Sequence, residues 1–208
     1  LLLDQIGGPV ATVLTDYAQQ VRVQAGDRDD EAPWRTQGAE ILFTGPSAAW
    51  ARAPSEPPPD WGNGPRWVQI ASAGIDSFPR WLTQGRIVTC GRGDAATPIS
   101  EYVLSALLHY ERRIDTHSPR SAAEWQNIVA PLRRAPTTGS LHGRVLGLAG
   151  FGAIGHAIAA RARAFGLSVH ALLPGAGTDN IQGIPPVASL SELFQQSDHL
   201  VLAMPLTA

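Results

Sequence analysis

The sequence has little that would support a secreted, membrane-bound or nucleic-acid-binding protein. Its 208 residues include one cysteine, Cys90, which excludes a disulfide framework and a zinc site made of several cysteines. The formal net charge is only −2, so neither nucleic acid nor an anionic membrane is expected as a main partner. The longest apolar runs, at 145–149 and 200–204, are far shorter than the roughly 20 residues that span a bilayer. We therefore expect a cytoplasmic protein with no membrane segment and no signal peptide.

Internal repeats and low-complexity tracts are also absent, while 44% of the residues are hydrophobic and 16% are charged. That composition is ordinary for a globular protein and excludes a disordered chain. The length fits one large domain or two small ones. The chain starts with leucine and stops directly after a strand-like run, so we expect it to be part of a longer polypeptide.

Short apolar runs bounded by glycine and proline predict buried strands at 41–44, 67–71 and 86–90. Between them, the segment 53–65 contains five prolines and two glycines, which predicts a surface loop. Further along, Thr97 as N-cap and Pro98 as first helical residue predict a helix over 98–114. The segment 118–140 is polar and interrupted by prolines, with Trp125 as its only large anchor.

The second half alternates strands and helices. Apolar runs predict strands at 144–149, 168–173 and 199–204. The first intervening helix carries an apolar stripe and ends at Gly166; the stripe consists of Ile154, Ile158, Ala162 and Phe165. Ser189 and Glu192 form a capping box that opens a second helix, ending near Gln196. Strands and helices in this order with short links predict a parallel, doubly wound α/β sheet.

A G-x-G-x-x-G motif, from Gly150 to Gly155, lies between the first of these strands and the helix after it. In this context Gly150 makes a tight turn, Gly152 leaves the backbone open to a pyrophosphate, and Gly155 allows close packing of helix on strand. The helix N-terminus then offers N–H groups and a positive dipole end to the phosphates. The motif predicts a dinucleotide site; the alternative is a glycine-rich turn without a ligand.

One part of this fingerprint is missing. An acidic residue about 20 positions after the glycines normally binds the ribose hydroxyls. Here the second strand ends in Ala171-Leu172-Leu173-Pro174, with neither an acid nor a nearby lysine or arginine for a 2′-phosphate. The choice between NAD and NADP is therefore open, with NAD slightly favoured.

Four sequence blocks together resemble the D-isomer-specific 2-hydroxyacid dehydrogenases. They read WVQIASAGID, ATPISEYVLSALLHYERR, LHGRVLGLAGFGAIGHAIAARARAFG and SDHLVLAMPLT, and they cover nearly the whole chain from Trp67 onward in the family's order. The resemblance implies a flavodoxin-like substrate (catalytic) domain at 1–98. It also implies a Rossmann-type NAD(P)-binding domain at 99–208, incomplete at its C-terminus.

The resemblance also implies roles for particular residues. Ser72, Ala73 and Gly74 match the loop whose N–H groups hold the substrate carboxylate, although a simple strand-ending turn is equally compatible with these residues. Leu173 falls where the family's ribose-binding acid stands. The implied cofactor-binding residues are Gly150, Gly152, Ala153, Ile154, Gly155, Leu173, Met204 and Pro205.

No catalytic residue can be assigned within the chain. The family's carboxylate-binding arginine, its glutamate and its acid/base histidine lie after the Pro-Leu-Thr block, and are thus expected beyond Ala208. We interpret the six histidines as surface or packing residues and Cys90 as packing. The six tryptophans are expected to act as core and loop anchors, and no metal site is predicted. The chain alone is expected to be inactive.

The resemblance thus implies an NAD(P)-dependent oxidoreductase that interconverts a small 2-keto acid, such as glyoxylate or hydroxypyruvate, and its 2-hydroxy acid by hydride transfer. It also implies a homodimer, with contacts through the helix that starts at Pro98 and the segment around Trp125. The alternative is a dinucleotide-sensing, corepressor-like binding module with little turnover. Intact downstream arginine, glutamate and histidine would favour the enzyme.

Overall fold

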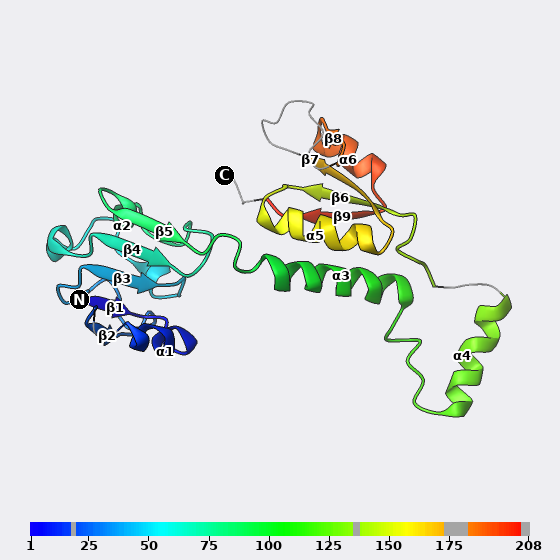
Figure 1. Ribbon diagram of the computed structural model, residues 1–208, viewed down its shortest axis with the longest axis horizontal. Helices are drawn as coiled ribbons and strands as arrows, with labels where there is room; N and C mark the ends of the chain where they lie inside the picture. The colour runs from blue at the N-terminus through cyan, green and yellow to red at the C-terminus, as the bar shows by residue number, and fades with distance from the viewer. Residues whose placement is uncertain (18–19, 135–137, 173–182, 205–208) are drawn as a thin grey trace. The chain divides into compact units, whose positions relative to one another are not determined.

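The chain forms two compact α/β units, Leu1–Arg92 and Gly93–Ala208, in a computed structural model. The structure describes residues 1–17, 20–134, 138–172 and 183–204. Each unit is built on its own parallel sheet (Figure 1). The predicted α/β class is therefore confirmed. The units divide after Arg92, whereas the proposed border between a substrate domain (1–98) and a dinucleotide domain (99–208) stays a prediction.

The first unit contains a five-stranded sheet in the order β2-β1-β3-β4-β5, the strand order of flavodoxin-like folds. Its short apolar runs form the strands as predicted at 41–44, 67–71 and 86–90, to within one residue. Two helices, α1 and α2, were not predicted. The bounds are β1 Leu2–Asp4, α1 Pro9–Asp16, β2 Val23–Ala25, β3 Ile41–Thr44, β4 Trp67–Ile70, α2 Arg80–Thr83 and β5 Ile87–Cys90.

Tryptophans dominate the core of the first unit. Trp50, in the 3₁₀ helix η1 (Trp50–Arg52), has its ring centroid 5.4 Å from that of Phe78 and 6.3 Å from that of Trp81. Trp34 packs edge-on against Trp50 at 6.1 Å. Aromatic rings of this size bury a large apolar area with few rotatable bonds. The sequence predicted single anchors, and the fold gathers four of them, Trp61 included, into one cluster.

The prediction of a surface loop at 53–65 was wrong for its second half. A second 3₁₀ helix, η2 (Pro59–Asn63), places Trp61 in the core at 4% exposure, with its ring centroid 4.7 Å from that of Trp81. The Arg86 guanidinium lies 4.6 Å from the Trp61 ring centroid and donates hydrogen bonds to the carbonyls of Trp61 and Pro65. Aromatic and cation–π contacts therefore hold a segment that its prolines exclude from the sheet.

The second unit contains a four-stranded sheet in the order β8-β7-β6-β9. Numbered along this unit the order is 3-2-1-4, as in the first part of a Rossmann sheet. Three helices flank the strands and a fourth, α4, follows α3 (Figure 1). The bounds are α3 Ala96–Arg112, α4 Ala122–Arg134, β6 Val145–Ala149, α5 Ala153–Ala164, β7 Ser168–Leu172, β8 Pro186–Val187, α6 Leu190–Gln196 and β9 His199–Leu202.

Helices cover both faces of this sheet. On one face, Leu148 of β6 packs with Leu104 of α3 and Ile158 of α5; on the other, Leu193 of α6 packs with Ala149 and Val187. A Cβ at Gly147 would overlap the hydroxyl of Ser197, so a residue without a side chain lets the end of α6 lie against β6. The predicted stripe of α5 is correct except for Phe165, which caps the helix and is 46% exposed.

The predicted start of α3 was wrong by two residues. The helix begins at Ala96 with Ala95 as N-cap, and no side chain caps it. Pro98 is therefore the third helical residue rather than the first, which is tolerated because N–H groups of the first turn have no intrahelical acceptor. The helix ends at Arg112 because Arg113 adopts a left-handed conformation with φ 49°.

Helix α4 lies in the segment that the sequence presented only as polar and proline-interrupted. The Ser121 hydroxyl accepts a hydrogen bond from the N–H of Glu124, whose carboxylate accepts one from the N–H of Arg120. This is the S-x-x-E pattern of a capping box, with the carboxylate bound to the N–H one residue before the N-cap, and α6, which the same pattern correctly predicted, begins in the same way. Within the described residues, no helix is long and apolar enough to cross a bilayer.

An ion pair joins the starts of β6 and β9. A guanidinium nitrogen of Arg144 lies 2.9 Å from the Asp198 carboxylate, which also accepts a hydrogen bond of 2.8 Å from the N–H of Val145. These contacts, the backbone hydrogen bond first, hold the pKa of Asp198 below its ordinary value of 3.8.

Replacing this carboxylate should destabilise the unit in a pH-dependent way. We expect Asp198→Asn to lower the free energy of unfolding at neutral pH. Because the folded-state pKa is lowered, the stabilisation is complete above 3.8 and is lost as the pH falls through the folded value. Urea denaturation of both proteins between about pH 7 and pH 3 measures the difference. If the difference in unfolding free energy between the wild type and Asp198→Asn stays constant over this range, the Asp198 carboxylate is not the source of the stabilisation.

Candidate dinucleotide-binding site

The glycine loop lies at the edge of the second sheet where β6, β7 and β9 end. Gly150 has φ 97°, a conformation that side chains disfavour, and its N–H donates to the carbonyl of Leu172 at 3.2 Å. A Cβ at this position would lie 2.8 Å from the backbone of Ala203. The fold itself therefore needs glycine at position 150, because the backbone passes there between the ends of β7 and β9.

Gly152 differs because the protein itself does not need a glycine there. It is the N-cap of α5 in an extended conformation, without a side-chain cap, and a Cβ would meet nothing within 4 Å. Open space therefore lies before the helix N-terminus, where N–H groups and the helix dipole favour an anion. At Gly155, by contrast, a Cβ would lie 2.7 Å from the carbonyl oxygen of Gly150, so the glycine lets the helix approach the loop.

The structure gathers most of the predicted cofactor residues at this edge. Ala153 and Ile154 form the first turn of α5, with Ala153 exposed. Met204 is 42% exposed, and its backbone nitrogen lies against Gly150. The residues 150–155 carry no charged side chain, so a pyrophosphate here would depend on backbone N–H groups. Leu173 and Pro205 lie outside the described residues.

The predicted carboxylate loop belongs to the first unit, where it follows β4. The Ser72 hydroxyl donates to the carbonyl of Gly74 at 2.7 Å, and the Ser72 carbonyl accepts from the N–H of Gly91 at 3.2 Å. Ala73 and Gly74 are exposed, and a Cβ at Gly74 would meet only the Asp76 carboxylate, at 3.6 Å. Gly91 thus holds the turn on one side, and the backbone of Ala73 and Gly74 is open on the other. The structure is compatible both with a carboxylate-binding loop and with a simple strand-ending turn.

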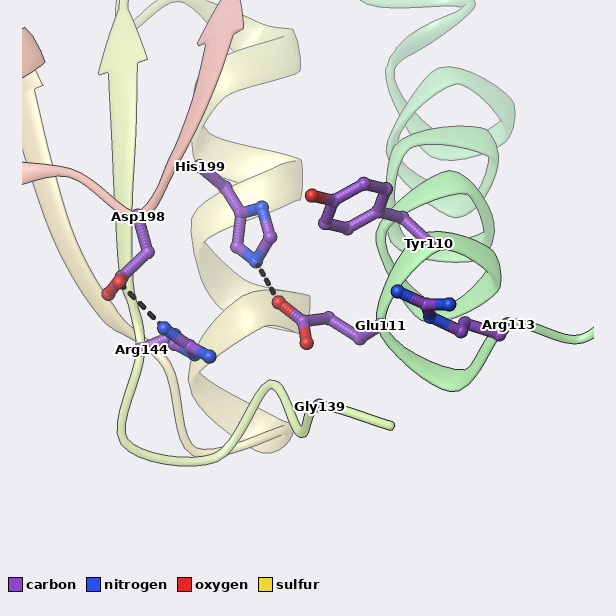
Figure 2. A pocket seen from close by; sticks show the side chains of 7 residues that line it. All are labelled: Tyr110, Glu111, Arg113, Gly139, Arg144, Asp198 and His199. Atoms are coloured by element: carbon purple, nitrogen blue, oxygen red, sulfur yellow. Dashed lines mark hydrogen bonds and ion pairs between the residues drawn. The ribbon is translucent and has the colours of Figure 1, made fainter. Parts of the chain in front are cut away.

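One histidine has a partner that the sequence did not indicate. His199, the first residue of β9, lies with its Nε2 atom 2.9 Å from the carboxylate of Glu111 in the last turn of α3 (Figure 2). The sequence did contain a signal that Glu111 is buried, because it follows Leu104 by seven residues, or two helical turns, and so lies on the core-facing side of α3. By contrast, the pair of His109 and Asp115 is exposed.

The family comparison agrees with the fold of the second unit. Residues 104–208 match the family model described as "D-isomer specific 2-hydroxyacid dehydrogenase, NAD binding domain". Among solved structures, D-mandelate dehydrogenase of Rhodotorula graminis superposes with a TM-score of 0.75 at 18% identity, over 99% of this chain and 65% of that one. A dehydrogenase of Rhizobium meliloti superposes with a TM-score of 0.61 at 22% identity, over 98% of this chain and 69% of that one.

A sequence relative of another kind is C-terminal-binding protein 1 of Caenorhabditis elegans. It is 32% identical over 135 residues, which is 62% of this chain and 19% of that protein. The chain thus spans about a fifth of this relative and about two thirds of the dehydrogenase structures. At these identities the structural likeness establishes the fold, and the family match establishes an NAD-binding domain.

Proposed function

Because this chain belongs to the D-isomer specific 2-hydroxyacid dehydrogenase family, we propose that it is part of an NAD(P)-dependent oxidoreductase acting on a small 2-keto acid and its 2-hydroxy acid. The observation that carries the proposal is the open space at Gly152, before the uncapped N-terminus of α5. A glycine that the fold does not require, placed where an anion is favoured, fits a pyrophosphate in contact with the backbone.

In the proposed complex, the backbone N–H groups of Ala153 and Ile154 hold the pyrophosphate, and Gly150 and Gly155 keep the loop in place. Met204 would line the adenosine; for Pro205, outside the described residues, this role stays a prediction from the family resemblance. The bound dinucleotide would supply the hydride. Ser72, Ala73 and Gly74 would hold the substrate carboxylate through their N–H groups, since successive backbone amides form an anion-binding concavity.

The chain itself is expected to bind the dinucleotide without turning over substrate. Reduction of a keto acid needs a proton donor at the carbonyl and a cation at the carboxylate, and we assign neither to residues 1–208. Incubating the purified chain with NADH and glyoxylate or hydroxypyruvate should leave the absorbance of NADH constant, while the whole protein oxidises it. Turnover by the chain alone would show that its own residues supply both groups.

The nucleotide preference is expected to be weak. With Leu173 in place of the acid, the ribose hydroxyls lose a charged acceptor, and the carboxylate that usually repels a 2′-phosphate is missing. The segment 172–180 has no lysine or arginine to attract that phosphate and one acid, Asp179, that would oppose it, so attraction and repulsion are both expected to be weak. We expect NADH and NADPH to differ in Kd by less than about tenfold, or roughly 1.4 kcal/mol, with NADH slightly favoured. Calorimetry at one salt concentration measures both. A preference above about a hundredfold would mean that another residue recognises the ribose.

A second candidate function is a dinucleotide-sensing binding module with little turnover. The similarity to C-terminal-binding protein 1 supports it, since that name describes binding and not catalysis. Both candidates require the glycine loop, so cofactor affinity does not separate them. Steady-state turnover of the whole protein does, because a sensor would bind NADH tightly and reduce keto acids only negligibly.

The homodimer also remains a proposal. Exposed apolar residues on α3 and α4 support it: Tyr102 and Tyr110 are each 74% exposed and Trp125 is 56% exposed. Exposed aromatic residues of this kind are enriched in protein interfaces.

A further inference from the structure

A buried pair of ionisable groups lies at the edge of the second sheet opposite the glycine loop. Glu111 and His199 have side chains only 8% and 10% exposed, and their closest polar atoms are 2.9 Å apart. The Nε2 atom of His199 has no hydrogen-bond partner among the described residues. The attraction is therefore that of an ion pair and depends on the charge of the imidazole.

The residues 138–140, here called the strap, lie against Glu111 of this pair. The strap lies so close that a Cβ at Gly139 would overlap the Glu111 carboxylate. The N–H of Gly139 donates to the Glu111 carbonyl at 2.8 Å, and the Arg112 guanidinium donates to the Gly139 carbonyl at 3.2 Å. Arg112 precedes α4 in the chain, and the strap follows α4. Arg112, before α4, and Gly139, after it, are therefore hydrogen-bonded to each other next to Glu111.

Two further charged groups act on the pair electrostatically: Arg144 on Glu111, and Asp198 on His199. Arg144 and Asp198, at the starts of β6 and β9, pair with each other at 2.9 Å. From α3, Tyr110 faces the imidazole edge-on at 6.1 Å between ring centroids, and the exposed Arg113 lines the same pocket of about 320 Å³ (Figure 2). The strap residues have no acidic or basic side chain. Among the described residues, Glu111 and His199 form a close ion pair only with each other.

We infer that Glu111 and His199 form a one-proton latch, which holds the strap against the last turn of α3. When the two side chains share one ionisable proton, the pair has no net charge and stays buried, with the strap against Glu111. Loss of that proton leaves a buried carboxylate, and gain of a second leaves a buried imidazolium. An unpaired buried charge is costly, so either change favours opening of the strap and entry of water. This inference does not depend on the proposed function.

Hydrogen exchange of the strap and of the last turn of α3, measured from about pH 4 to pH 9, tests the latch. Comparing each variant with the wild type at the same pH removes the intrinsic pH dependence of exchange. In the wild type we expect greatest protection between the two titrations. On each side the opening constant should rise by up to about tenfold per pH unit. The double variant Glu111→Leu/His199→Val should show no such dependence.

The single variants should give opposite curves. His199→Gln leaves only the carboxyl group, so the strap should be protected in acid and open at neutral pH. Glu111→Gln leaves only the imidazole, so the strap should be open in acid and protected at alkaline pH. The exposed pair of His109, in the same helix, and Asp115, three residues after its end, provides the matched control, and Asp115→Asn should keep the wild-type curve. If the two single variants give parallel curves, or if the double variant titrates as the wild type does, the latch is overturned.

Discussion

Dinucleotide affinity should fall at least about 30-fold, or roughly 2 kcal/mol, when Gly152 is replaced by valine, while the free energy of unfolding stays near its wild-type value. A Cβ at this position meets nothing within 4 Å, so the fold tolerates it. The same side chain would occupy the space in which the pyrophosphate contacts the backbone, and would remove charge-assisted hydrogen bonds. Calorimetric titration with NADH measures the affinity.

The matched control is Gly150→Ala in the same loop. Its φ of 97° and the 2.8 Å approach of a Cβ to Ala203 mean that this variant should lose stability whether or not a ligand is present. The two glycines are only two positions apart, yet one variant should affect binding and the other folding. An unchanged Kd for Gly152→Val would show that the loop is structural and would remove the basis of the proposed function.

Breaking the Glu111–His199 pair should have the largest effect on stability. His199→Val leaves a carboxylate that is 8% exposed without its partner. We therefore expect a loss of about 3–4 kcal/mol, within the range known for disrupted buried pairs. Urea denaturation at pH 7 measures it.

Replacing both partners should restore most of this loss. Glu111→Leu/His199→Val leaves no charge to be solvated, and apolar replacements of buried ion pairs are often neutral or stabilising. The double variant is expected within about 1 kcal/mol of the wild type or above it. If the loss of unfolding free energy in the double variant equals the sum of the losses in Glu111→Leu and His199→Val, the two residues contribute independently and do not act as a pair.

The sequence alone was sufficient where local pattern and local structure coincide. Strands β3, β6 and β7 follow apolar runs with glycine or proline near their ends, and α6 begins at a capping box formed within four residues. In the glycine loop, the conformation of Gly150 and the close packing at Gly155 also follow from motif and context. Such features depend on interactions between neighbouring residues, which a linear pattern contains.

Tertiary structure decided the features that join distant segments. Trp61 lies in a proline-rich segment that has no strand or α-helix pattern, and it is buried only because Trp81 and Arg86 meet it in space. Glu111 occupies a core-facing position that its charge should exclude, and it is buried there next to His199 of β9, which lies 2.9 Å away. The sequence therefore determined the strands β3, β4, β5, β6, β7 and β9, the helices α5 and α6 and the glycine loop, while packing decided which isolated aromatic and charged side chains are buried. A buried side chain is stabilised by partners from other elements, and a linear pattern does not specify those partners.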